Sequence, residues 1–195
     1  MKFDLHVHTS ISACSQLPLE DIIAQAKERG LAGVCITDHD TMEARHCLRE
    51  GLQPDGLCVI FGMEYATSEG DFLLFGPYEQ LQPGLAAPEL LRHVEMTGGV
   101  AVAAHPFRVN RPTREYLVDH GLCGIVEGIN GRNHQHENDR VGTWLDRYGV
   151  KQVGGSDAHS LEELGRVTTR FHQPIRNRAE LIHALKNSSY TPERN

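Results

Sequence analysis

Hydrophobic residues recur along the chain in two periods, one typical of strands and the other of helices. The short apolar runs predict strands at 2–7, 32–37, 57–66, 71–76, 99–104, 123–129, 150–155 and 166–171. Apolar positions spaced three and four apart predict helices at 18–29, 41–50, 88–97, 112–120, 137–148 and 178–187. Strands and helices alternate over most of the chain, which predicts a largely parallel sheet with covering helices.

The first strand, KFDLHV, carries an unusual polar face. Apolar Phe3, Leu5 and Val7 alternate with polar Asp4, His6 and His8. Alternate residues of a strand point the same way, so the carboxylate and the two imidazoles share one face. Two imidazoles on one face can bind a single metal ion, and we expect Asp4 to orient one of them.

The number of strands favours a barrel over an open sheet. Seven or eight strands are predicted, and no glycine-rich phosphate loop follows the first of them. A full (β/α)8 barrel typically takes about 250 residues. The chain has 195 residues and shows no linker or repeat, so we expect one α/β domain over 1–195. Its expected architecture is a distorted (β/α)7-type barrel, with the residues after Asn187 frayed.

Composition and charge narrow the function classes. Hydrophobic residues make up 39% of the chain, the formal net charge is −7, and the five cysteines are scattered. No basic stripe is present, so we expect no duplex nucleic acid as a partner. The sequence shows no apolar run of membrane-span length and no signal peptide, which predicts a cytoplasmic protein without membrane contact. The cysteines predict neither a disulfide framework nor a zinc ribbon.

Polar residues gather where the predicted strands end. They are His6, His8, Asp38, His39, Glu64, His105, Glu127, Asn130, Asp157 and His159. The carboxyl ends of parallel barrel strands open on one face, so these groups should converge. Imidazoles and carboxylates suit zinc, manganese or iron, and a bridging carboxylate with several histidines is what a two-metal hydrolytic site needs.

The remaining histidines fall outside this pattern. His46, His93, His120, His172 and His183 lie in predicted helices or exposed segments, and we interpret them as surface residues. A second His-x-His pair, His134 and His136, is expected to open a helix rather than to bind metal.

Five motifs, in this order, resemble those of the polymerase and histidinol phosphatase (PHP) family. They are DLHVHT, TDHDT, Glu64 after a strand, AHPF and GGSDAH, and they run from residue 4 to residue 159. The resemblance implies a distorted barrel of βα units that holds two or three metal ions at the strand ends. It also implies hydrolysis of phosphate esters.

The resemblance assigns a role to each matching residue. The first metal would take His6, His8, Glu64 and Asp157; Glu64 would bridge to a second metal held by His105; the third would take His39 and His159. Asp71 stands where the family often has a histidine ligand of the second metal, and it can still ligate. Ala13 replaces a family aspartate that helps to hold the third metal. The adjacent Cys14 or water would complete that third site, or the site would be weak.

These assignments predict a metal-dependent phosphoesterase with two or three divalent transition ions (Mn, Fe or Zn). Its substrate would be a small phosphorylated metabolite or nucleotide, attacked at phosphorus by metal-activated hydroxide. Glu64, Asp157 and His159 are the expected catalytic residues. Arg108, in HPFR, is the first candidate to clamp the phosphate, and Arg132 is the second.

Two other functions remain open at this stage. The first is a metal-binding regulatory module without turnover, which the departure at Ala13 favours. The second is hydrolysis of a C–N or C–O bond. That chemistry often uses a carbamylated lysine, and no lysine lies at a predicted strand end. The sequence makes no prediction of oligomeric state.

Overall fold

The computed structural model describes residues 1–195, whose strands form two sheets. The first sheet has the order β11-β10-β1-β2-β4-β3. Its members are β1 (Lys2–Val7), β2 (Gly33–Ile36), β3 (Gly51–Leu52), β4 (Cys58–Phe61), β10 (Val167–Phe171) and β11 (Tyr190–Arg194). The second sheet runs β5-β6-β7-β8-β9. It consists of β5 (Met63–Thr67), β6 (Gly70–Phe75), β7 (Val100–Ala104), β8 (Ile125–Asn130) and β9 (Lys151–Gly155).

The architecture is mixed α/β, and the expected (β/α)7 barrel is not confirmed, because the strands do not close into one ring. Parallel pairing joins β1 to β2 and β4, and β7 to β8 and β9. Antiparallel pairing joins β5 to β6, β6 to β7, and β1 to β10. The chain turns back between β5 and β6 without a helix, so the alternation of strand and helix that a barrel needs is interrupted there.

Gly62 lies where the chain passes from the first sheet to the second. The single strand expected over 57–66 is divided there into β4 and β5. A Cβ atom at Gly62 would lie 2.5 Å from the backbone oxygen of Leu74. The close approach of β6 therefore requires glycine at this position.

The helices cover the outer faces of the sheets; α6 has the predicted bounds and α2 the predicted length, whereas α1, α3 and the 41–50 segment are shorter than the sequence pattern predicts. They are α1 (Leu19–Ala26), α2 (Ala87–Met96), α3 (Tyr116–Asp119), α4 (Gln135–Asp139), α5 (Val141–Tyr148) and α6 (Arg178–Asn187). Only one 3-10 turn, η1 (Glu43–His46), forms within the helix expected over 41–50. The helix expected over 137–148 is two helices separated at Arg140. The predicted fraying after Asn187 is wrong, because β11 pairs with β10 along its whole length.

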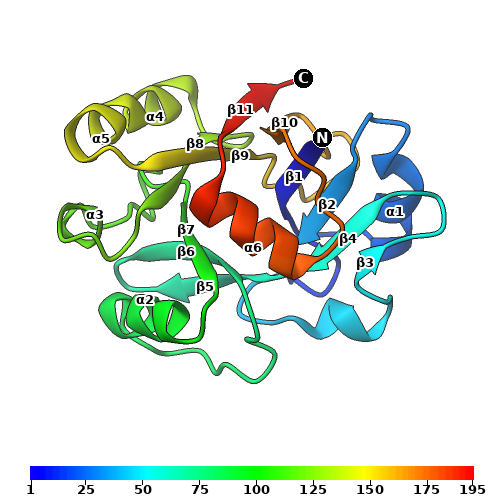
Figure 1. Ribbon diagram of the computed structural model, residues 1–195, viewed down its shortest axis with the longest axis horizontal. Helices are drawn as coiled ribbons and strands as arrows, with labels where there is room; N and C mark the ends of the chain where they lie inside the picture. Colours follow the sequence, from blue (N-terminus) through cyan, green and yellow to red (C-terminus); the bar gives the residue numbers. More distant parts are fainter.

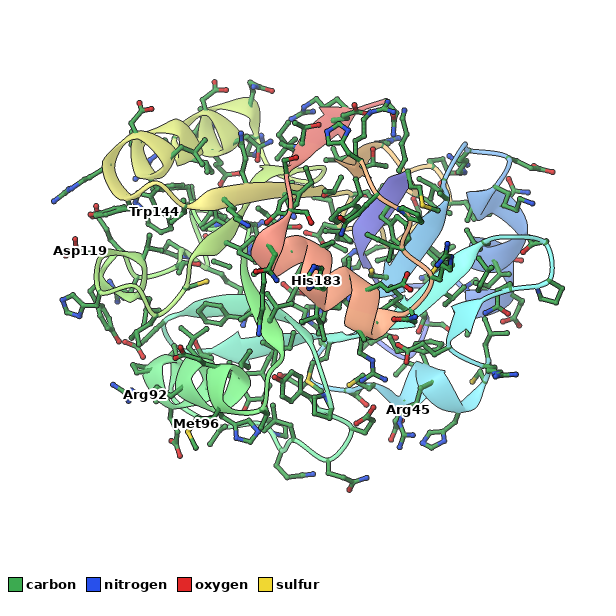
Figure 2. All side chains as sticks on the ribbon, viewed as in Figure 1. Arg45, Arg92, Met96, Asp119, Trp144 and His183 are labelled. Atoms are coloured by element: carbon green, nitrogen blue, oxygen red, sulfur yellow. The ribbon has the colours of Figure 1, made fainter.

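Helix α6 packs across both sheets and seals one side of the molecule (Figure 1). Leu181, Ala184 and Leu185 are buried in one cluster with residues of β1 and β6. On the opposite side of the helix, His183 is exposed (Figure 2). The polar site therefore lies away from this apolar layer.

The two sheets meet at the carboxyl ends of their strands. Isolated parallel bridges join Val7 to Ala158 and His39 to Glu64. The first bridge brings the end of β1 beside the segment after β9, and the second brings the segment after β2 beside β5. Side chains from both sheets consequently converge at this junction.

Candidate metal centre

Four side-chain atoms from the two sheets meet in a buried cluster at the junction. Nε2 of His6 lies 3.0 Å from Nε2 of His8 and 3.3 Å from Oε2 of Glu64. The nitrogen of His8 lies 3.2 Å from the same Glu64 oxygen, and both nitrogens lie 3.5 Å from Oδ1 of Asp157. Ligands held about 2.0–2.1 Å from a tetrahedral ion are roughly 3.3–3.4 Å apart. The cluster therefore has the spacing of a metal site.

The outer ring nitrogens of His6 and His8 are held by hydrogen bonds, so both Nε2 atoms face the cluster. Nδ1 of His6 donates to Oε1 of Glu127 over 2.9 Å. Nδ1 of His8 lies 3.3 Å from the hydroxyl of Ser12, which itself donates to Asp38 over 2.6 Å. The Ser12 oxygen must therefore accept from His8, so each imidazole carries a proton on its outer nitrogen and directs Nε2 toward the cluster.

Glu64 divides its two oxygens between neighbouring groups. Oε2 faces His6, His8 and also Nδ1 of His39 at 3.0 Å, whereas Oε1 lies 2.8 Å from Nε2 of His105. Burial would raise the pKa of Glu64, but the surrounding histidines hold it well below its usual value. Burial also opposes protonation of His6, yet the charges of Glu127, Asp157 and Glu64 raise its pKa well above the usual value.

A second group of potential ligands consists of Glu64, Asp71 and His105, all buried. Oδ2 of Asp71 lies 4.0 Å from Nε2 of His105. Both Asp71 oxygens also face Arg111, at 2.8 Å from Nε and 2.9 Å from Nη2. Nδ1 of His105 is buried without a hydrogen-bond partner. The donors of this second group are therefore present but less completely satisfied than those of the first.

A third group consists of His8, His39 and His159. Nδ1 of His159 donates to the backbone oxygen of Asp157 over 2.8 Å, which leaves its Nε2 with a lone pair. That nitrogen lies 3.1 Å from Sγ of the exposed Cys14. Burial and the nearby carboxylates of Glu64 and Asp157 raise the pKa of the Cys14 thiol.

Special backbone geometry presents the donors at the strand ends. His105 and Asp157 have φ angles of 32° and 56°, in the region that non-glycine residues rarely adopt. A Cβ atom at Gly155 would lie 2.6 Å from both Glu127 Oε1 and the Cβ of His6. Glycine at this position therefore allows β9 to approach the His6–Glu127 pair.

The prediction that Asp4 orients an imidazole is wrong. Its carboxylate accepts from the backbone nitrogens of Ser156 and Gly165, each at 2.9 Å, and from the Ser156 hydroxyl. Asp4 thus fixes the loop that carries Asp157. Glu127 orients His6 instead, and it also accepts from the backbone nitrogen of His105 over 2.7 Å.

The two predicted phosphate ligands, Arg108 and Arg132, differ in whether they contact the cluster. Nη2 of Arg108 donates to Oδ2 of Asp157 over 2.7 Å and to Asn130 over 2.9 Å, so Arg108 borders the cluster. Nε of Arg132 lies 3.4 Å from Glu163, and its side chain is 43% exposed. Arg111 was not a candidate on sequence, although it also reaches the site through Asp71.

The other histidines take no part in these groups. His46, His93, His120, His172 and His183 are exposed, as predicted. His134 caps the start of α4, as expected for that pair, and its ring stacks on His136.

The donor set suits divalent transition ions. Each group combines imidazole nitrogens with carboxylate oxygens or lies beside a thiol, and the first is closed to solvent. Candidate metal-binding groups are thus present where the sequence placed them.

Known proteins resemble this chain over most of its length. A profile described as PHP-associated matches residues 135–190. The probable phosphatase YcdX of Escherichia fergusonii is 32% identical over 196 residues, covering 83% of this chain and 80% of the relative. Among solved structures, PsfC from Pseudomonas syringae shares 18% identity with a TM-score of 0.79, covering 100% of this chain and 91% of PsfC.

Fold, donor groups and relatives together define a hydrolase enzyme with a centre for divalent metal ions. The chain belongs to the polymerase and histidinol phosphatase (PHP) family. The family resemblance and the prediction of a hydrolase are thereby confirmed.

The expectation of no duplex nucleic acid is not confirmed. PfuEndoQ, a lesion-specific endonuclease from Pyrococcus furiosus, matches with a TM-score of 0.72 and 17% identity, covering 98% of this chain and 57% of the endonuclease. Endonuclease Q has also been solved with a 27-mer duplex substrate. At this identity the match shows a shared fold and carries no conclusion about the substrate of this chain. No helix in this chain combines the length and apolarity needed to cross a membrane.

Proposed function

We propose that this protein is a metal-dependent phosphoesterase acting on a small phosphorylated metabolite or nucleotide, within a single PHP-like domain over 1–195. The observation that carries the proposal is the buried convergence of two imidazole nitrogens and two carboxylate oxygens at 3.0–3.5 Å. Burying so many polar groups together is costly, and a bound ion would compensate that cost.

Three positions would hold the ions. The first position would be formed by His6, His8, Glu64 and Asp157. The second would be formed by Glu64, Asp71 and His105, and the third by His39 and His159 with Cys14. Bound divalent ions supply a water of lowered pKa and neutralise the charge on phosphoryl oxygens. Glu64 is the proposed bridge, because its two oxygens already face different groups of histidines.

The chain's own residues bind and orient the substrate. Arg108 donates through Nε to Asn133 and through Nη2 to Asp157 and Asn130, while its Nη1 makes no hydrogen bond within the chain. This fixed guanidinium, 27% exposed, can present Nη1 to a phosphoryl oxygen. His159 can protonate a leaving oxygen only while the third position is empty, because as a ligand of a third ion its Nε2 carries no proton. Arg132 lies farther out, where it can contact the remainder of a small substrate.

Phosphate release tests the proposal. Protein purified without a His-tag or chelator is reconstituted with Mn, Fe or Zn and assayed on a panel of sugar phosphates, nucleotides and short single-stranded oligonucleotides. The expected result is metal-dependent release of inorganic phosphate from small esters, which ethylenediaminetetraacetic acid abolishes. Absence of hydrolysis with two or more ions bound would refute the proposed function and favour a regulatory metal-binding module.

Labelled duplex DNA, with and without an abasic lesion, belongs in the same panel. The fold shared with Endonuclease Q motivates this substrate, whereas the net charge of −7 argues against it. Cleavage of the duplex without hydrolysis of small esters would mean that the substrate is a nucleic acid and not a small phosphorylated molecule.

A further inference from the structure

The second metal position contains a cation of the protein's own. Arg111 and Asp71 form a two-pronged ion pair, with Nε 2.8 Å from Oδ2 and Nη2 2.9 Å from Oδ1. The Asp71 side chain is only 3% exposed, whereas that of Arg111 is 49% exposed. The guanidinium thus reaches inward from the surface to a carboxylate that faces His105 and Glu64.

This pairing conflicts with metal binding in two ways. Nη2 of Arg111 donates to Oδ1 of Asp71, which occupies a lone pair on that oxygen, and Nε lies close to the other oxygen, so fewer lone pairs are free for an ion. The positive charge of the guanidinium also repels a divalent ion that enters between Asp71 and His105.

Arg111 has room to leave. Its side chain lines a polar surface cavity of about 290 Å³. The lining residues are Thr67, Ser68, Gly70, Asn110, Arg111, Pro112 and Arg114. The guanidinium can turn into this cavity and remain hydrated there, so separation from Asp71 leaves no buried unpaired arginine.

We infer that Arg111 competes with the second divalent ion for Asp71 and thereby keeps the affinity of that position low. The inference rests on the proposed metal centre and adds a regulating residue to it. It predicts one tighter and one weaker class of ion in the wild-type protein. Arg111 is a positioning residue in this scheme, since it acts through Asp71.

Metal titration of the full chain tests this competition without reference to turnover. Binding of Mn²⁺ or Zn²⁺ is measured against a chromophoric chelator for wild type, Arg111→Gln and the control Arg114→Gln. Arg114 lies on the same loop, carries the same charge and makes no contact with Asp71. Circular dichroism checks that each variant is folded.

Arg111→Gln should bind the weaker ion about tenfold more tightly. That factor equals about 1.4 kcal/mol, near the lower end of what a hydrogen bond to a charged group contributes, and breaking the Arg111–Asp71 pair costs an amount of this order. Arg114→Gln should leave both affinities unchanged. Unchanged or weaker binding in Arg111→Gln would overturn the inference, because Arg111 would then be neutral or would help to position Asp71 for the ion.

A double-mutant cycle separates competition at Asp71 from general charge repulsion. Asp71→Asn should weaken the second ion, and adding Arg111→Gln to it should restore almost none of the affinity. A full tenfold gain in the Asp71→Asn background would overturn the claim that Arg111 acts through Asp71. Failure of the proposed function looks different: the wild-type protein would bind ions in these titrations and release no phosphate.

Discussion

Replacement of Glu127 by glutamine should weaken metal binding without disturbing the fold. Oε1 of Glu127 accepts from Nδ1 of His6, and Oε2 accepts from the backbone nitrogen of His105 and from Asn130. Glutamine has only one side-chain oxygen. That oxygen can accept from both the backbone nitrogen of His105 and Asn130 only if the NH2 group faces Nδ1 of His6. His6 must then accept at Nδ1 and carry its proton on Nε2, the nitrogen that faces Glu64 and Asp157.

The magnitude follows from the bonds involved. A buried hydrogen bond to a charged group contributes roughly 1.5–3 kcal/mol. Each 1.4 kcal/mol changes an equilibrium constant tenfold, so the loss should be about 10–100-fold in metal affinity. In the alternative orientation the NH2 group faces the backbone nitrogen of His105 and Asn130. Both of these are donors, so this orientation loses a similar amount of hydrogen-bond free energy.

Competition with a chromophoric chelator measures the effect, alongside the midpoint of urea unfolding. Glu95→Gln, on the exposed side of α2, removes the same charge far from the site and should leave metal affinity unchanged. Metal affinity within twofold of wild type in folded Glu127→Gln would refute the reasoning. The tautomer of His6 would then be set by something other than Glu127.

Three further changes probe the centre. Glu64→Gln keeps the shape but removes the charge shared among the histidines, so phosphate release should fall roughly a hundredfold or more, and wild-type turnover would exclude a bridging role. Arg108→Ala should raise the KM for a phosphomonoester more than it lowers the melting temperature; an unchanged KM would exclude substrate contact. Because the pKa of Cys14 is raised, in a Cys47→Ser protein its reaction with a disulfide reagent should be slow at pH 7 and accelerate toward pH 9. Bound metal should block that reaction, and equal rates with and without metal would show that Cys14 is not a ligand.

The candidate metal ligands could be predicted from the sequence because polar residues occur at the ends of its predicted strands. His6 and His8 alternate with apolar residues, and Glu64 and His105 each follow a run of buried residues, so local pattern was enough. The partners of those donors were harder to predict. Glu127 lies 121 residues from His6, and Arg111 lies 40 residues from Asp71. Nothing local distinguishes such a partner from any other polar residue at a strand end or in a loop.

The prediction of a closed barrel was not confirmed for a related reason. Periodicity reports which residues are buried, but it does not report whether neighbouring strands run parallel or antiparallel. The apolar run over 57–66 gave no sign of the passage between sheets at Gly62, because glycine is common at both bends and turns. The tail over 190–194 has few apolar residues, and its strand forms through backbone pairing with β10.

The position of the centre also explains why so many polar groups are buried together. His6 and His8 come from the first sheet, whereas Glu64 and the loop holding Asp157 come from the second. Two isolated bridges join the sheets at that edge, and contacts among these polar side chains add to them. An ion held by both sheets would therefore link metal binding to the stability of the junction, since binding energy gained only in the folded chain adds to folding free energy. Apolar residues in the same place would join the sheets without a binding site, so the polar junction is better explained by the ions than by the fold alone.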